Sequence, residues 1–345
     1  MTITEIKASV SSFPLPSPFV TAVRRADSLD EAVITVQTDC GVTGYGAASQ
    51  TAAVTGDTPG SVVYAAETIF APMFTGRVLS LSLLDEADRA LMHNSGAKAA
   101  LDMAFYDALS KQAGQPLYAY LGGRAREMRT DVTISAAEPA KTASDALSAV
   151  QRGFSILKIK LGRGMDEDLR TLRALRSALP DGILLRLDAN QAWSVSEAVS
   201  AASECERLGL DVDFIEQPTP YYDLDALGAV AGAVDIPVLA DESAYDLRAI
   251  RAILESGCAD MINIKLLKLG GIRPSLEAVR LCAEYGAQPV MGCMLEGILG
   301  SAAAVHFACA AGIDRLDTDA PLLCGLTRAR DVVFEAGGHI RFCQT

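Results

Sequence analysis

Charged side chains recur in the middle of the chain at the ends of short apolar segments, at nearly constant intervals. The segments end at Lys160, Asp188, Glu216, Asp241 and Lys265, so the intervals are 28, 28, 25 and 24 residues. One strand, one helix and the loops that join them fit into an interval of this length. Consecutive strand–helix units predict parallel strands whose charged ends meet at one edge of a sheet.

Segments with the length and apolar character of a buried strand occur eight times after Gly122 and Gly123. Amphipathic stretches rich in alanine and leucine separate them, which indicates alternating strands and helices. The predicted strands are 132–134, 156–159, 183–187, 214–215, 238–240, 261–264, 289–291 and 315–316. Eight such strands predict a β/α barrel, and barrel enzymes place their active sites at the carboxyl ends of the strands.

The chain before this repeat has a different pattern. Apolar and polar residues alternate over 3–10 and 32–38, and helical periodicity follows at 60–74, 80–92 and 95–112. We therefore predict an α+β capping domain at 1–124 and a (β/α)7β TIM-like barrel at 125–319. Residues 320–345 are too few for another strand–helix unit, so we expect them to pack back on the capping domain and complete it.

Charge and composition exclude several classes of protein. A net charge of −13 without a basic stripe disfavours nucleic-acid binding. No apolar run approaches the ~18 residues that a membrane-spanning helix needs. The eight cysteines are scattered without a Cys-x-x-Cys pair, which is typical of reduced thiols in a cytoplasmic protein. We expect a cytoplasmic homo-oligomer that acts on a small molecule.

Three successive predicted strands offer one carboxylate each, from Asp188, Glu216 and Asp241. Oxygen ligands on neighbouring strands suit a hard, octahedral cation such as Mg²⁺. Any one of these acids could instead form an ion pair with a lysine. The joint pattern at constant spacing favours a metal site.

Two lysines flank this arc of acids. Their strands are four apart in an eight-stranded barrel, so Lys160 and Lys265 are expected to face each other across the pocket. A carbon between them could lose a proton to one amine and gain a proton from the other, which is the geometry of a two-base racemase or epimerase. Lys158 lies on the same strand face as Lys160, so we expect it to contact the substrate or a carboxylate. Lys268 is interpreted as a supporting or solvated lysine.

A resemblance to a known family rests on five motifs at strand ends. They are KIK at 158–160, DAN at 188–190, IEQP at 215–218, ADES at 240–243 and NIKLLKLGG at 263–271. Together they resemble the muconate-lactonizing subgroup of the enolase superfamily, and the resemblance covers essentially the whole chain. It implies abstraction of a proton α to a carboxylate, giving an enolate that Mg²⁺ stabilises. It also implies that Asp188, Glu216 and Asp241 bind the metal ion and that Lys160 and Lys265 are the acid/base pair.

The subgroup includes lactonizing enzymes, o-succinylbenzoate synthases, N-acylamino acid racemases and dipeptide epimerases, so the fold does not choose the substrate. The last predicted strand leads into Asp317-Thr318-Asp319. An Asp-x-Asp at this place is similar to dipeptide epimerases, in which the two acids hold the α-ammonium group of the substrate. An isolated Asp-x-Asp could instead be a solvated turn.

The capping domain gives a second indication of the substrate. Residues 18–24 resemble the cap loop of Ala-Glu epimerases, in which the arginine meets the glutamate side chain, and this implies that Arg24 contacts the substrate. Arg24 could equally be a solvent-facing cation beside Arg25. Residues 44–58 resemble a second cap loop. We expect Thr133 and Met294 to line the pocket.

These features predict an isomerase: a Mg²⁺-dependent epimerase of the L-Ala-D/L-Glu type. It would act on the α-carbon of the C-terminal residue of a dipeptide by two-base 1,1-proton transfer. An N-acylamino acid racemase or an o-succinylbenzoate synthase is the alternative, although their substrates lack an ammonium group for Asp317 and Asp319. A non-catalytic metal-binding barrel is disfavoured because both lysines and all three acids are present.

Overall fold

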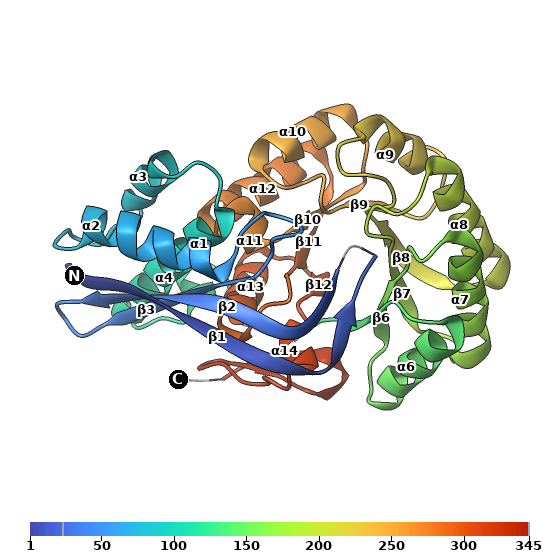
Figure 1. The fold of residues 1–345 in the computed structure, drawn as a ribbon, viewed down its shortest axis with the longest axis horizontal. Helices are drawn as coiled ribbons and strands as arrows, with labels where there is room; N and C mark the ends of the chain where they lie inside the picture. The colour runs from blue at the N-terminus through green and yellow to red at the C-terminus, as the bar shows by residue number, and fades with distance from the viewer. Residues whose placement is uncertain (23, 344–345) are drawn as a thin grey trace.

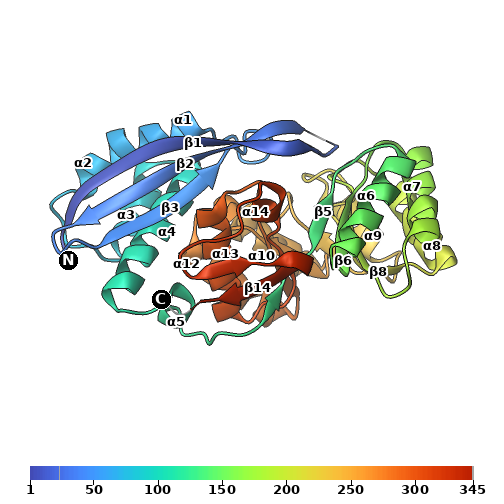
Figure 2. The same cartoon turned by 90° about the horizontal axis from the view of Figure 1, so that it is seen from below.

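A three-stranded antiparallel sheet forms one layer of the N-terminal domain in the computed structural model, which describes residues 1–22 and 24–343. Its strands are β1 (Ile3–Val20), β2 (Arg25–Thr38) and β3 (Thr43–Ser49), in that order. The β1–β2 hairpin is longer than predicted, and its tip reaches the mouth of the barrel (Figures 1 and 2). Val23, in the predicted cap loop at this tip, lies outside the described residues.

The prediction that Gly44 and Gly46 lie in a cap loop is wrong, because both residues belong to β3. The two glycines allow this strand to lie directly against helix α4 (Ser95–Gln112). A Cβ atom at either position would come 2.0 Å from the carbonyl oxygen of Ala104 or Ala100. Only the later part of the predicted loop, which contains Val54, reaches the cavity described below.

Helices cover one face of this sheet (Figure 1). The predicted helix at 60–74 consists of three consecutive helical segments, α1 (Pro59–Tyr64), the π-helical η1 (Ala65–Phe70) and α2 (Ala71–Phe74). α3 (Leu83–Ala90), α4 and α5 (Leu117–Tyr120) complete the domain. The buried rings of Phe70 and Phe105 both pack on Phe74, so they join the first helices to α4.

The predicted barrel is confirmed as eight parallel strands in sequential order. They are β5 (Val132–Ile134), β6 (Ile156–Lys160), β7 (Leu184–Asp188), β8 (Asp211–Glu216), β9 (Val238–Ala240), β10 (Met261–Ile264), β11 (Gln288–Gly292) and β12 (Leu316–Asp317). A single parallel bridge between Thr130 and Leu316 joins the β5 end of the sheet to the β12 end. We call this junction the seam.

Helices alternate with the strands around the outside of the barrel (Figures 1 and 2). They are α6 (Pro139–Gln151), α7 (Met165–Ala178), α8 (Val195–Leu208), α9 (Leu224–Ala231), α10 (Leu247–Ser256), α11 (Leu266–Leu269), α12 (Ile272–Tyr285) and α13 (Ile298–Ala311). Local signals fix their ends. Helix α8, for example, begins with a capping box between Ser194 and Glu197 and ends at Gly209 in the left-handed conformation.

The C-terminal segment contains α14 (Ala320–Leu323), β13 (Val332–Phe334), η2 (Ala336–Gly338) and β14 (His339–Phe342). β13 and β14 form a small antiparallel sheet with β4 (Met128–Arg129). The ring of Phe342 lies 4.6 Å from that of Tyr118 on α5. The segment thus touches the last helix of the N-terminal domain, while the domain limits at 124 and 319 stay predictions. No helix within the described residues is both long and apolar enough to cross a membrane.

Candidate active site

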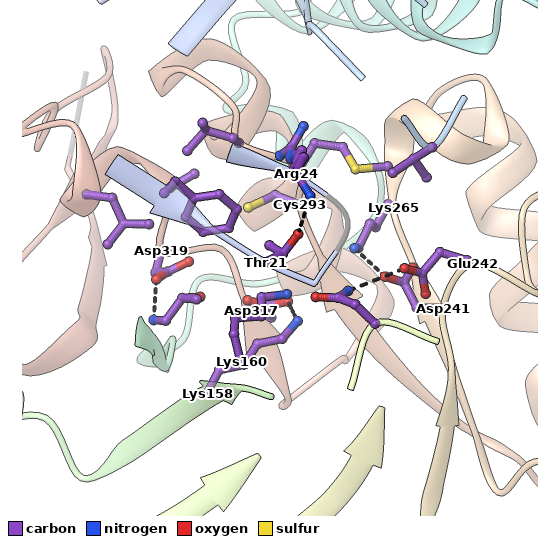
Figure 3. A pocket seen from close by; sticks show the side chains of 18 residues that line it. Thr21, Arg24, Lys158, Lys160, Asp241, Glu242, Lys265, Cys293, Asp317 and Asp319 are labelled. Atoms are coloured by element: carbon purple, nitrogen blue, oxygen red, sulfur yellow. Dashed lines mark hydrogen bonds and ion pairs between the residues drawn. The ribbon is translucent and has the colours of Figure 1, made fainter. Parts of the chain in front are cut away.

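One cavity opens at the carboxyl ends of the barrel strands, beneath the tip of the β1–β2 hairpin (Figure 3). Charged side chains line it: Arg24, Lys158, Lys160, Asp241, Glu242, Lys265, Asp317 and Asp319. Apolar side chains from the hairpin and from the segments after β11 and β12, among them Phe19 and Leu323, also contribute. Thr133 and Met294 belong to the lining as well. The cavity therefore contains most of the site residues predicted from the sequence, together with several side chains that the sequence did not indicate.

The three predicted metal ligands lie side by side because the strand register places them there. Asp188 on β7 pairs with Glu216 on β8, and Asp241 follows the end of β9. All three are at most 4% exposed. The side-chain amide oxygen of Gln217 accepts the backbone N–H of Asp241, at 2.9 Å, which fixes the start of the loop after β9.

Lysine amines contact each of these carboxylates. Nζ of Lys160 lies 2.5 Å from Asp188, and Nζ of Lys158 lies 2.7 Å from Glu216 and 3.1 Å from Asp188. Burial alone would raise the pKa of Asp188, but the two ammonium groups outweigh it and hold that pKa below its ordinary value. Burial and the nearby Asp188 raise the pKa of Glu216 to about 8. These like charges repel one another, so positive charge at this point stabilises the ionised carboxylates.

The donor set around these acids fits a hard cation. Within the described part of the chain, three buried oxygens close to the acids have no hydrogen-bond partner: Asn190 Oδ1, Glu242 Oε2 and Asn263 Oδ1. The amide group of Asn263 donates to Glu216 at 3.0 Å, so its free oxygen lies next to that ligand. Carboxylate and amide oxygens without soft ligands are the set that Mg²⁺ prefers.

Lys265 approaches the acids from the other side of the arc (Figure 3), and its Nζ lies 2.6 Å from Asp241. Burial alone would lower the pKa of Lys265, but Asp241 outweighs it and raises that pKa above its ordinary value. This direction is opposite to the lowering that suits a lysine base. A cation held by Asp241 would oppose the rise.

Lys268 is buried rather than solvated. Its amine donates to the carboxylate of Asp241 at 2.5 Å, to the carbonyl of Asp241 at 2.6 Å and to the carbonyl of Asn263 at 2.9 Å. These bonds fix the position of Asp241, the third of the predicted metal ligands. The structure therefore favours the interpretation of Lys268 as a supporting lysine over that of a solvated lysine.

Asp317 and Asp319 lie at the seam; in Figure 3, Asp319 is on the far side of the cavity from Asp241 and Asp317 lies between them. Asp317 accepts from Nζ of Lys158 at 2.7 Å, and Asp319 accepts the backbone N–H of Thr133 at 2.6 Å. Burial and the neighbouring Asp317 raise the pKa of Asp319 to about 6. Neither acid is a solvated turn residue, since both are at most 5% exposed.

A third seam acid, Asp131, was missing from the sequence prediction. One oxygen from each of Asp131, Asp317 and Asp319 lies within 4.8 Å of the others. Asp131 comes immediately before β5, at the beginning of a strand, so the strand-end pattern contains no signal for it.

Arg24 reaches the cavity from the tip of the β1–β2 hairpin. Its guanidinium group lies 5.6 Å from the ring of Phe19 and 3.4 Å from the carbonyl of Gln50. Burial lowers the pKa of Arg24, and none of the described carboxylates forms an ion pair with it. The adjacent Arg25 is different, because it is exposed and pairs with Asp27 at 2.8 Å. The hairpin thus turns one arginine toward the cavity and the other toward solvent.

Met294 belongs to the loop after β11. The buried carboxylate of Glu296 accepts its backbone N–H at 2.8 Å, and burial raises the pKa of Glu296 to about 7. Cys293 beside it lines the cavity, and burial raises the pKa of its thiol well above the ordinary value. A thiol held neutral in this way forms part of the wall and is a poor nucleophile.

Comparison with known proteins places both halves of the chain in one family. Residues 4–122 match the N-terminal domain of mandelate racemase / muconate lactonizing enzyme, and residues 141–333 match the enolase C-terminal domain-like family.

Individual relatives share most of their length with this chain. An L-Ala-D/L-Glu epimerase of Clostridium acetobutylicum is 38% identical over 94% of this chain and 91% of the relative. A substrate-liganded L-Ala-D/L-Glu epimerase from Bacillus subtilis has a TM-score of 0.94 and 35% identity, over 99% of this chain and 97% of the other. A dipeptide epimerase from Enterococcus faecalis, in complex with Mg and L-Leu-L-Tyr, has a TM-score of 0.93 and 33% identity, over 100% and 98% of the two chains.

Proposed function

The chain belongs to the enolase superfamily, in the family of mandelate racemase and muconate lactonizing enzyme, and we propose that it is a Mg²⁺-dependent dipeptide epimerase. One observation carries this proposal above all others. Lys160 and Lys265 enter the same cavity from strands four apart in the barrel, with buried carboxylates between them. Two amines on opposite sides of one carbon can exchange its proton for another on the opposite face.

In the proposed reaction, Asp188, Glu216 and Asp241 would hold the cation. Mg²⁺ would supply positive charge where negative charge develops on the substrate carboxylate. One of Lys160 and Lys265 removes the α-proton of the C-terminal residue. The other donates a proton to the opposite face of the same carbon, and the chirality at that carbon is inverted.

The acids of the seam favour a dipeptide over an N-acyl amino acid. Asp317 and Asp319 line the cavity at the seam, and Lys158 lies between Asp317 and the proposed ligand Glu216, at 2.7 Å from each. We expect the N-terminal end of a dipeptide to extend toward the seam. Two buried carboxylates compensate the ammonium group for the hydration that it loses on leaving water. The N-acylamino acid racemase and o-succinylbenzoate synthase alternatives leave these acids without a partner in the substrate.

Arg24 favours an acidic side chain on the second residue of the dipeptide. Its guanidinium group borders the cavity without a carboxylate partner among the described residues, so it is available for a charged ligand. Bidentate contact with a carboxylate is the usual use of such a group. We therefore propose L-Ala-D/L-Glu as the substrate type. The cytoplasmic location and the homo-oligomer stay predictions.

A substrate panel tests this proposal. The enzyme is incubated with Mg²⁺ and L-Ala-L-Glu, L-Ala-L-Leu, N-acetyl-L-Ala-L-Glu or an N-succinyl amino acid, and the configuration of the products is read by chiral chromatography. We expect epimerisation of the free dipeptides, fastest for L-Ala-L-Glu, and poor turnover of both acylated compounds. Faster turnover of the acylated compounds would replace the epimerase with an N-acylamino acid racemase.

A further inference from the structure

The seam of the barrel is held by side chains rather than by a regular strand ladder. The single bridge between Thr130 and Leu316 is reinforced by the hydroxyl oxygen of Thr130, which accepts the backbone N–H of Thr318 at 2.8 Å. Asp319 adds its bond to the backbone N–H of Thr133. The positions of Asp317 and Asp319 therefore depend on how firmly these few contacts hold two short strands together.

A buried arginine reaches this seam from inside the barrel. Arg186 belongs to β7, and only 2% of it is exposed. Its guanidinium group donates to the carbonyl of Leu316 at 2.6 Å and to the carboxylate of Asp131 at 2.7 Å. Leu316 directly precedes Asp317, and Asp131 directly precedes β5. One guanidinium group thus forms hydrogen bonds on both sides of the seam.

The same guanidinium group balances charge beneath the seam. Asp131, Asp317 and Asp319 approach one another closely, and Lys158 contacts only Asp317 of the three by ion pairing. The guanidinium group of Arg186 lies 2.7 Å from the carboxylate of Asp131 and 3.1 Å from that of Asp213, and both Arg186 and Asp131 are buried. Without this charge Asp131 would be a buried, unpaired anion next to the two acids that face the cavity.

We propose that Arg186 is a positioning residue for substrate binding: it fixes the seam so that Asp317 and Asp319 point at the ammonium group of the substrate. This proposal rests on the function proposed above. Arg186 is buried, and its guanidinium group bonds to Leu316, Asp131 and Asp213, so it acts through these residues and not by touching substrate. Its place on β7 links the strand that carries Asp188 to the seam between β5 and β12.

The outer part of the same network offers a matched control. Asp213 accepts from Arg186 at 3.1 Å and from Arg315 at 2.9 Å. The side chain of Arg315 is 39% exposed, and its other bond goes to Gln288, away from the seam. Arg315→Met therefore removes an arginine from the same carboxylate without releasing Leu316 or Asp131.

The test compares Arg186→Met, Arg186→Met/Asp131→Asn and Arg315→Met with the wild type, using L-Ala-L-Glu and Mg²⁺. The double variant removes both buried charges, so it is expected to fold where the single variant fails to fold. It still removes the shorter of the two hydrogen bonds to the carbonyl of Leu316, and leaves only the backbone N–H of Asp131 at 3.4 Å. We expect KM to rise about tenfold or more in both Arg186 variants, because a lost hydrogen bond to a charged group weakens binding on this order.

The kcat of the folded Arg186 variants should change by less than about threefold, because the ammonium contact lies away from the reacting carbon. Arg315→Met should leave KM within about twofold of the wild type. A purely structural role predicts a lower melting temperature with an unchanged KM of the folded enzyme. That result in the double variant would overturn the proposal.

A wild type that epimerises no dipeptide would overturn the proposed function instead. Crystals of the double variant would then decide the positioning role alone. A carboxylate of Asp317 that has moved out of hydrogen-bond range of Lys158 would support it, and an unmoved carboxylate would contradict it.

Discussion

The two sides of the barrel rim hold their charged side chains by different means. From β6 to β8, the backbone ladder places Lys160 beside Asp188 and Asp188 beside Glu216. At the seam, one isolated bridge and a set of side-chain bonds do the same work for Asp317 and Asp319. Strand register tolerates the loss of a neighbouring side chain, whereas a contact made by side chains does not.

This contrast separates two kinds of expected defect. In the proposed reaction, the metal side supplies the groups for proton transfer and charge stabilisation, so substitutions there should lower kcat. The same proposal gives the seam the role of holding the far end of the substrate, so substitutions there should raise KM. Removal of the cation and substitutions on each side of the rim test this division.

Removal of the divalent cation should have the largest effect. After dialysis against a chelator, epimerisation should fall to background, because several kcal/mol of charge stabilisation are lost with the ion. Added Mg²⁺ should restore the rate, which serves as the control for unfolding. Full turnover after exhaustive chelation would remove Asp188, Glu216 and Asp241 from the mechanism.

Lys160→Ala and Lys265→Ala should each abolish epimerisation. The loss in kcat should be about 10²–10⁴-fold or more, the usual contribution of general acid–base catalysis. Lys141→Ala is the matched control, because Lys141 is exposed on α6 and pairs with Asp145. Hydrogen–deuterium exchange of one substrate epimer without inversion could persist in one variant, since a single base remains. Near-normal epimerisation by both variants would contradict the two-base scheme.

On the other side of the rim, Asp317→Asn or Asp319→Asn should lower kcat/KM for L-Ala-L-Glu by about tenfold or more, because an ammonium group loses a charged partner in a buried site. Binding of Mg²⁺, measured by calorimetry, should be retained. Asp314→Asn is the control, because the side chain of Asp314 is 80% exposed in the loop before β12. A large loss of metal affinity in the seam variants would erase the distinction between the two sides.

Arg24→Ala, in the hairpin above the rim, should have an effect that is restricted to substrates with an acidic second residue. A charge-assisted contact with a carboxylate contributes on the order of 1.5–3 kcal/mol, so kcat/KM for L-Ala-L-Glu should fall about tenfold to a hundredfold. The rate for L-Ala-L-Leu should fall much less. Arg25→Ala, at the exposed neighbouring position, should leave the ratio of the two substrates unchanged. Equal losses on both substrates would make Arg24 a structural cation.

The metal side of the rim was readable from the sequence because its chemistry coincides with strand ends. Strand-end residues recur with the length of a strand–helix unit, so Lys160, Asp188 and Glu216 could be found by counting. The eight strands followed from the same repeat. This part of the fold is predictable because a local sequence pattern repeats several times along the chain.

The seam and the cap were less readable, because their residues work through contacts across long sequence separations. Arg186 and Asp131 meet 55 residues apart, and neither occupies a strand end that faces the cavity. Gly44 and Gly46 resemble loop residues until the backbone of α4 is seen against them. Close approach of two backbones leaves no periodic signal in a sequence.

The most direct test of the whole account is the mass of the substrate after turnover in D₂O. The wild-type enzyme is incubated with Mg²⁺ and L-Ala-L-Glu, and the recovered dipeptide is analysed by mass spectrometry and chiral chromatography. Two-base proton transfer predicts L-Ala-D-Glu that carries one solvent deuterium at the α-carbon of the second residue, a gain of about one dalton. Inverted product without deuterium, or no exchange at all while Mg²⁺ is bound, would contradict the account.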